Sequence, residues 1–238
     1  MKTTNYLTET AILDYENPLI RDLVSSRGWN DLTTFEAIGG IYTFVRDAIA
    51  FGYNADDALP ASAVLRNGYG QCNTKGTLLM ALLRAVGIPC RFHGFTIHNE
   101  LQRGAIPEYL LRLAPREIIH SWVEVEYDGR WVNLEGFILD SPYLRAIQRR
   151  FATVSGEFSG FAVATTDLAN PPIDWHGEST YIQSEGISRD LGTFETPDEF
   201  YALHGSNLRG LKRFFYAVVI RHCINANVRR IRAGTSRM

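Results

Sequence analysis

A cysteine stands where a glycine-containing loop meets a long apolar segment. Residues 67–72 read NGYGQC, and the apolar run that follows ends near Gly87 and Pro89, which predicts a helix that begins at Cys72. The N-terminus of a helix has unpaired N–H groups and the positive end of the helix dipole. Both features stabilise a thiolate, so this cysteine is a candidate nucleophile. The alternative is a cysteine that packs as a small apolar side chain.

A second group of residues suited to chemistry lies on a predicted β-hairpin. Residues 118–136 read IIHSWVEVEYDGRWVNLEG, and Asp128-Gly129 between two alternating runs is typical of a two-residue type I′ turn. This turn pairs Trp122 with Glu135 and puts His120 on the same face, diagonal to Glu135. A histidine beside a carboxylate is an oriented general base, which a cysteine nucleophile needs.

The face of the hairpin that carries His120 also carries two tryptophans, Trp122 and Trp131. Such a face is unlike a solvated surface, so we expect another element to pack there, and the helix that begins at Cys72 is the candidate. The tryptophans could form the wall of a substrate pocket for an acyl group, or they could be ordinary core residues.

The two segments together resemble the core of the transglutaminase-like superfamily. The resemblance covers about residues 35–140 and rests on Ala61-Ser62-Ala63-Val64-Leu65, on Gly68, Gly70, Cys72 and Lys75, on LLRAVGIPCR, and on the run from His120 to Glu135. It implies an α+β fold of papain or transglutaminase type, with a cysteine at the start of a central helix packed on an antiparallel sheet. It also implies a catalytic Cys–His–Asp triad.

Within this resemblance Cys72 takes the nucleophile position and His120 the base position. The third position departs from the family, because this chain has Glu135 where Asp is usual. Glutamate can orient the imidazole with a small shift of the ring. The alternative third member of the triad is Asn133 on the same face, since asparagine serves that role in papain-like proteases.

These residues predict acyl chemistry through a thioester intermediate. The Cys72 thiolate would attack an acyl carbonyl, and the oxyanion needs fixed donors. The backbone N–H of Cys72 is one expected donor, and the second is open among Gln71, Asn67 and Tyr53. The substrate class (peptide, small molecule or carrier-bound acyl group) and the outcome (hydrolysis, transfer or cyclisation) stay open. The competing prediction is a catalytically silent module that binds a peptide or protein in the same groove.

The composition of the chain limits the kinds of partner, compartment and metal site that we expect. The chain has 238 residues, 45% of them hydrophobic, and a net charge of −2, which favours neither nucleic acid nor a membrane surface as a partner. The N-terminus lacks the apolar run of a signal peptide, so we expect a cytoplasmic protein. The three cysteines and six histidines form no metal-binding pattern, and we expect no metal and no cofactor.

The chain outside the resemblance is harder to interpret. We expect a single domain, residues 1–238, in which residues 141–238 form a C-terminal extension. Residues 155–190 predict loops with a short strand over 161–165, and helices are expected from Thr196 and over about 208–231. No acidic residue follows Glu199, so this end could dock an acidic protein partner. Alternatively, the segment FFYAVVI packs on the core and the arginines pair with acids elsewhere in the chain.

Overall fold

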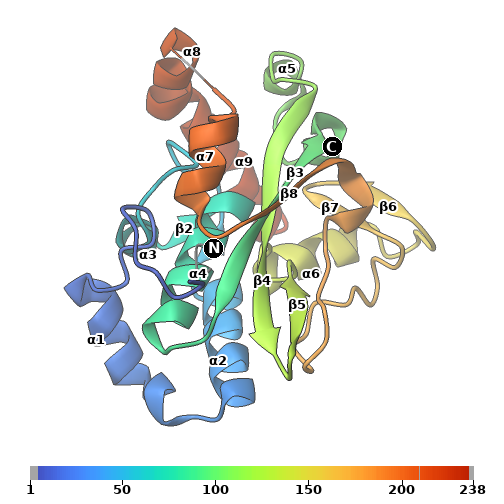
Figure 1. Ribbon diagram of the computed structural model, residues 1–238. Coiled ribbons are helices and arrows are strands. Elements are labelled where there is room, and N and C mark those ends of the chain that lie inside the picture. Colours follow the sequence, from blue (N-terminus) through green and yellow to red (C-terminus); the bar gives the residue numbers. More distant parts are fainter. Residues whose placement is uncertain (1–4, 209, 236–238) are drawn as a thin grey trace.

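A four-stranded antiparallel sheet forms the centre of the protein. The computed structural model describes residues 5–208 and 210–235. Figure 1 shows the helices of residues 18–85 on one side of the sheet and residues 141–165 on the other. The strands lie in the order β5-β4-β3-β8. Their bounds are Cys90–His98 for β3, Glu117–Tyr127 for β4, Arg130–Leu134 for β5 and Ile187–Phe194 for β8.

Helix α4, which starts at Cys72, is the central helix. It contacts strand β4 and helices α1, α2 and α3, which Figure 1 shows gathered on one side of the sheet. All its residues from Asn73 to Arg84 are buried, as expected of a helix enclosed on every side. The predicted α+β fold with a cysteine at the start of a central helix is therefore confirmed. The helix bounds are Pro18–Arg27 (α1), Thr34–Asp47 (α2), Ala61–Asn67 (α3) and Cys72–Ala85 (α4).

Local sequence signals explain where these elements begin and end. Helix α2 begins with a capping box in which Thr33 accepts from the N–H of Glu36 and Glu36 accepts from the N–H of Thr33. Helix α4 ends at a backbone reversal where Gly87 has a φ of 77°, a conformation that glycine adopts without strain. Short pieces complete this half: β1 (Ala50–Phe51), β2 (Tyr69–Gly70), α5 (Glu108–Leu111) and 3₁₀ turns at Trp29–Asp31 and Asn99–Gln102.

The hairpin of β4 and β5 has the predicted register. Asp128 and Gly129 have φ values of 51° and 73°, the positive pair that a two-residue type I′ turn requires. Glu124 pairs with Asn133, and the ladder ends where Val123 pairs with Leu134. Glu135 follows the last residue of β5 directly, so it leaves the ladder and its side chain is free to turn toward His120.

The face on which α4 packs differs from the prediction. Gly76 of α4 lies against Val123 and Ser121, which point to the face opposite Trp122. The Trp122 face is covered instead by Tyr181 from the extension, whose ring centroid lies 5.8 Å from that of Trp122. The expectation that α4 covers the tryptophan face is wrong, because the buried apolar stripe of β4 that suits a helix is Val123 and Val125.

The C-terminal extension adds a strand to the main sheet. Residues 161–165 were predicted as a strand, but Phe161 and Ala162 form the turn of a small hairpin, with φ values of 54° and 60°. Strand β8 was missed, because it is a half-exposed edge strand with no alternating pattern. The extension comprises α6 (Ser141–Arg150), β6 (Phe158–Gly160), β7 (Val163–Thr165), a 3₁₀ turn (Ser184–Gly186), β8, α7 (Pro197–His204), α8 (Gly210–Phe215), a π-helical segment (Tyr216–Ile220) and α9 (Arg221–Arg232).

The last helices bury a different stripe from the one expected. Ile224, Val228 and Ile231 of α9 are buried, whereas most of the apolar segment FFYAVVI (214–220) is exposed: the exposed fractions are 60% for Phe214 and 53% for both Val218 and Val219. The alternative in which this segment packs on the core is therefore wrong for most of its residues. No helix in the described part of the chain is long and apolar enough to cross a membrane.

Candidate active site

Cys72 is the first residue of α4, as predicted. Gln71 caps the helix, and its backbone N–H donates to Thr74 Oγ1 over 3.1 Å. The Cys72 side chain is half-buried, and its Sγ lies 3.6 Å from Asn73 Oδ1. As the first helical residue, Cys72 has a backbone N–H with no acceptor inside the helix. The sulfur thus sits beside an unpaired donor at the positive end of the helix.

His120 and Glu135 are joined, although the predicted pair of Trp122 with Glu135 does not form, because the ladder ends at Leu134. His120 Nε2 lies 2.9 Å from Glu135 Oε1, and both side chains are fully buried. This bond leaves Nδ1 as the ring nitrogen that can face another group, and Nδ1 has no hydrogen-bond partner within the described residues. The imidazole is therefore oriented by a carboxylate on one side and has a free nitrogen on the other.

The pKa of His120 responds to Cys72 as well as to Glu135. Burial by itself lowers the pKa of His120, because the imidazolium loses hydration. The adjacent Cys72 sulfur and the Glu135 carboxylate favour the imidazolium more strongly, and together they raise that pKa to about 10. The arrangement thus favours the imidazolium form of His120.

Glu135 is held by backbone donors that the sequence did not reveal. Its Oε2 accepts from the N–H of Ile182 over 2.9 Å and from the N–H of Gln183 over 3.0 Å. One oxygen of the carboxylate is therefore committed to the backbone and the other to His120. These donors come from residues 155–190, where the sequence shows only loop composition, so no local signal could have found them.

Asn73, the residue after Cys72, joins helix α4 to strand β4 through hydrogen bonds. Its Nδ2 donates to Asp57 Oδ1 (3.1 Å) and to the carbonyl of Ile119 (3.3 Å), and its Oδ1 accepts from Ser121 Oγ (2.9 Å). Ile119 and Ser121 flank His120 in β4, so this one amide sets the distance between helix and strand. The sequence signal for this bracing residue was an asparagine directly after Cys72, and the sequence-based prediction missed it.

Asp57 accepts hydrogen bonds from side-chain amides near the start of α4. Its carboxylate accepts from Gln71 Nε2 (3.0 Å), Asn73 Nδ2 (3.1 Å) and Asn207 Nδ2 (2.9 Å). Burial raises the pKa of Asp57, and the three amide donors partly oppose that rise. Asn207 in turn accepts from the N–H of Ile119 over 2.7 Å. The C-terminal extension therefore braces the strand that carries His120.

Replacing Asn73 by alanine is expected to reduce the free energy of unfolding by about 1–3 kcal/mol, because Asp57 and Ser121 would keep buried polar atoms without this partner. Urea unfolding followed by circular dichroism measures the change. Asn67→Ala is the matched control: Asn67 is exposed at the end of α3, and its replacement should stay within about 0.5 kcal/mol. Equal stability of the two variants would contradict the bracing role of Asn73.

The four candidates for support or for the second oxyanion donor have different environments. Gln71 and Tyr53 line the cavity beside Cys72, but Gln71 Nε2 donates to Asp57 and Tyr53 Oη donates to Gln102 Oε1. Asn67 is exposed and is not among the residues that line this cavity. Asn133 Nδ2 donates to Tyr181 Oη over 2.8 Å, so the structure places Asn133 beside Tyr181, while Glu135 holds His120.

The two tryptophans do not line the cavity beside Cys72. Trp122 is buried between Phe95 and Tyr181, at centroid distances of 4.1 and 5.8 Å. Trp131 lies under the Arg91 guanidinium, 4.2 Å from the ring centroid, and packs on Tyr6. The prediction of a pocket wall is wrong for this cavity, because both rings point to the face of the hairpin away from α4. Among residues 5–208 and 210–235, no cluster of His, Cys, Asp and Glu side chains could hold a metal ion.

Comparison with known proteins finds a similarity over the segment that contains these residues. Residues 25–136 match the family model described as the transglutaminase-like superfamily. A solved structure from Cytophaga hutchinsonii, described as "a Putative Cysteine Protease", is similar over 82% of this chain and 47% of its own, with 11% sequence identity and a TM-score of 0.47. This chain thus spans about half the length of that protein. No curated protein matches the sequence. The part of the chain that is similar to the transglutaminase-like superfamily, residues 25–136, therefore contains Cys72, His120 and Glu135.

Proposed function

We propose that the protein is a cysteine-dependent enzyme that transfers an acyl group, or cleaves an amide or thioester, through an acyl-enzyme on Cys72. Cys72 is the nucleophile, His120 the general base and acid, and Glu135 the residue that orients the imidazole. The superfamily match supports a cysteine-dependent enzyme in general. The observation that carries the proposal is the buried bond of 2.9 Å between His120 Nε2 and Glu135 Oε1, next to a cysteine at a helix N-terminus.

The proposed first half-reaction forms the acyl-enzyme. The Cys72 thiolate attacks the carbonyl carbon of the donor, and the carbonyl π electrons move to oxygen. The N–H of Cys72 donates to this oxyanion, and the helix dipole stabilises the same charge. As the tetrahedral intermediate collapses, the bond to the leaving amine or thiol breaks and His120 gives it a proton. Cys72 now carries the acyl group as a thioester.

The second half-reaction reverses these roles. His120, now neutral, removes a proton from water or from an acceptor amine, and the acceptor attacks the thioester carbonyl. The C–S bond breaks, the thiolate returns, and the imidazolium that remains is stabilised by Glu135. Water as the acceptor completes hydrolysis, and an amine completes transfer. The same residues therefore serve a peptide, a small molecule or a carrier-bound acyl group as the substrate.

The reactivity of Cys72 tests this proposal. Near neutral pH, iodoacetamide should alkylate Cys72 about tenfold faster than a free thiol such as N-acetylcysteine, since a helix N-terminus and a neighbouring imidazolium both stabilise a thiolate. Turnover of an acyl thioester should fall as pH rises through about 10, because the raised pKa of His120 means that the imidazolium is held below that pH and lost above it. Alkylation needs no imidazolium and should not fall there.

Two controls and two outcomes complete this test. Circular dichroism at each pH shows whether the fold persists, and mass spectrometry of tryptic peptides shows which cysteine has reacted. If Cys72 reacts no faster than the free thiol, no activated thiolate exists, and a catalytically silent module that binds a peptide or protein becomes the better account. Fast alkylation without an acyl-enzyme would mean that the donor class is wrong.

The basic C-terminal end is a second element of the proposal, as a docking site for an acidic protein partner. Two of its arginines are committed within the chain: Arg213 pairs with Asp56, and Arg232 Nη2 lies 2.7 Å from Asp140 Oδ2. Arg229 and Arg230 are exposed and form no ion pair with the described residues. These two residues carry the proposed docking charge.

Reversing both charges, Arg229→Glu with Arg230→Glu, is expected to raise the KM for an acidic carrier-bound acyl donor severalfold and to leave turnover of a small thioester unchanged. The effect should shrink as salt screens the charges over about 8–10 Å. Steady-state kinetics at low and high salt measure it. Arg149→Glu is the matched control, because Arg149 is an exposed arginine at the end of α6. Identical kinetics with both substrates at both salt concentrations would mean that these arginines only solvate the helix.

A further inference from the structure

A large cavity opens beside Cys72, and most of its wall is apolar. Its volume is about 520 Å³, within the roughly 300–1,000 Å³ usual for small-molecule sites. Cys72, Gln71 and Asn73 form one part of the wall. The rest is built mainly of aliphatic and aromatic side chains, among them Ile97, Ile106, Ile119, Leu208, Tyr216 and Ile224.

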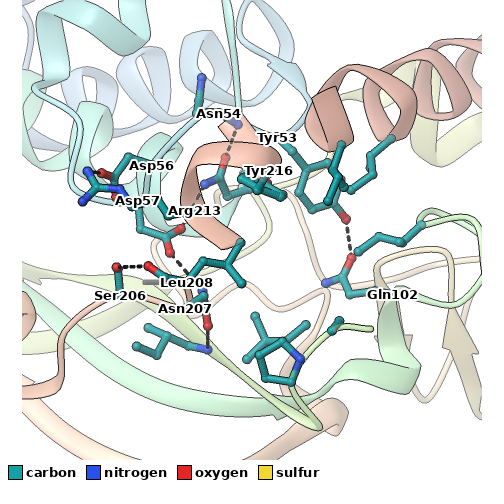
Figure 2. Close-up of a pocket in the computed structure, with 18 of the residues that line it drawn as sticks. Tyr53, Asn54, Asp56, Asp57, Gln102, Ser206, Asn207, Leu208, Arg213 and Tyr216 are labelled. Carbon is teal, nitrogen blue, oxygen red and sulfur yellow. Dashed lines mark hydrogen bonds and ion pairs between the residues drawn. The ribbon is translucent and has the colours of Figure 1, made fainter. Parts of the chain in front are cut away.

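Most polar side chains in this wall are bonded within the protein; Gln183 Oε1 has no hydrogen-bond partner, and Lys212 forms no ion pair, within the described residues. Figure 2 shows two such groups with open space between them. In one, Tyr53 Oη donates to Gln102 Oε1 over 2.5 Å; in the other, Asp57 accepts from Asn207, and Arg213 pairs with Asp56. Because most of these polar atoms already have partners and the rest of the wall is apolar, a polar ligand group would lose hydration for few new bonds over most of this space, whereas an apolar group fits it.

The C-terminal extension supplies one wall of the cavity. Residues 206–224 contribute Leu208, Leu211 and Ile224, and all of them lie beyond the segment that matches the superfamily. Leu211 is 76% exposed and Leu113, from the other side, is 75% exposed, although both line the cavity. Large apolar side chains left exposed around a cavity are typical of a site that an apolar ligand covers.

We propose that the acyl donor carries a medium-length aliphatic or an aromatic acyl group, which binds in this cavity while Cys72 attacks its carbonyl. The inference rests on the proposed function, because it takes Cys72 as the nucleophile. The core of residues 25–136 supplies the chemistry, and the extension selects the acyl group. A donor with a short or polar acyl group leaves the cavity wall in contact with water and is a poor substrate.

A chain-length series tests the inference. The donors are N-acetylcysteamine thioesters with acetyl, butyryl, hexanoyl, octanoyl and phenylacetyl groups, and intact-protein mass spectrometry measures the rate constant for acylation of Cys72. Each buried methylene should raise that rate constant roughly fourfold until the cavity is filled. A rate constant that is flat along the series, or highest for acetyl, would overturn the inference.

A charge placed in the wall sharpens the test. Leu211→Asp should lower the octanoyl-to-acetyl ratio of rate constants about tenfold, because the carboxylate must be desolvated by the chain. Leu203→Asp is the matched control: Leu203 is 71% exposed on α7, lies outside the cavity wall and should keep the ratio. Both leucines are exposed, so neither change should unfold the protein. An equal ratio in the two variants would count against the cavity as the acyl site.

Binding without chemistry separates the two proposals. In Cys72→Ala, titration calorimetry with the acetyl and octanoyl thioesters should show tighter binding of octanoyl by the same chain-length rule. If Cys72 of the wild type is not activated toward iodoacetamide but this preference persists, the proposed function fails and the apolar site stands. If Cys72 is activated but neither binding nor acylation depends on chain length, the site inference fails and the nucleophile stands.

Discussion

Replacing Cys72 by alanine is expected to lower the acylation and turnover of a thioester donor by roughly 10⁴- to 10⁶-fold, the loss typical when the nucleophile of a catalytic triad is removed. No other cysteine can substitute. Cys90 is fully buried in the core, and its Sγ faces the carbonyl of Met80 at 3.6 Å. Release of free thiol and intact-protein mass spectrometry together measure turnover and the adduct.

Cys223→Ala is the matched control for this experiment. Cys223 is exposed on α9, so it is the thiol most open to unspecific acylation. This variant should keep full turnover and the adduct on Cys72. Thioester turnover that survives in Cys72→Ala, or an adduct that forms only on Cys223, would show that the chemistry does not use the helix N-terminus.

Replacing Glu135 by glutamine is expected to lower turnover by roughly 10⁴-fold while the fold persists, by analogy with the loss of the carboxylate in serine protease triads. The two backbone N–H groups of Ile182 and Gln183 require an acceptor, so they hold the amide oxygen of the new side chain. Its NH₂ group then faces His120 Nε2 and donates to it. The proton of the neutral ring moves to Nδ1, and His120 can no longer accept a proton on the side of Cys72.

Two control variants test whether turnover depends on the charge of residue 135, on the length of its side chain or on the neighbouring Asn133. Glu135→Asp keeps the carboxylate but shortens its reach, so it should retain far more turnover than Glu135→Gln. Asn133→Ala removes only the bond to Tyr181 Oη and should cost much less than either. Unchanged turnover in Glu135→Gln, with His120→Ala inactive, would mean that His120 needs no orienting carboxylate. Thermal unfolding of each variant checks that the fold persists.

The sequence by itself determined the parts of the site that depend on near neighbours. The glycine-containing loop before an apolar run places Cys72 at the start of α4, because the helix cannot extend back through Gly68 and Gly70. Asp128-Gly129 sets the register of the hairpin as far as the pair of Val123 with Leu134, and Glu135, the next residue after β5, then reaches His120. Both signals act between residues that are close in the sequence, so they do not depend on how the rest of the chain packs.

The tertiary structure decided everything that joins distant residues. Glu135 is held by N–H groups 47 and 48 residues away, and Asp57 binds Asn207 across 150 residues. The face on which α4 packs, the edge strand β8 and the apolar cavity wall from residues 206–224 were likewise invisible in the sequence. The physical reason is that a backbone N–H or an exposed leucine has no sequence signature of its own. Its role depends on which element the packed chain brings to it, and no local pattern encodes that partner.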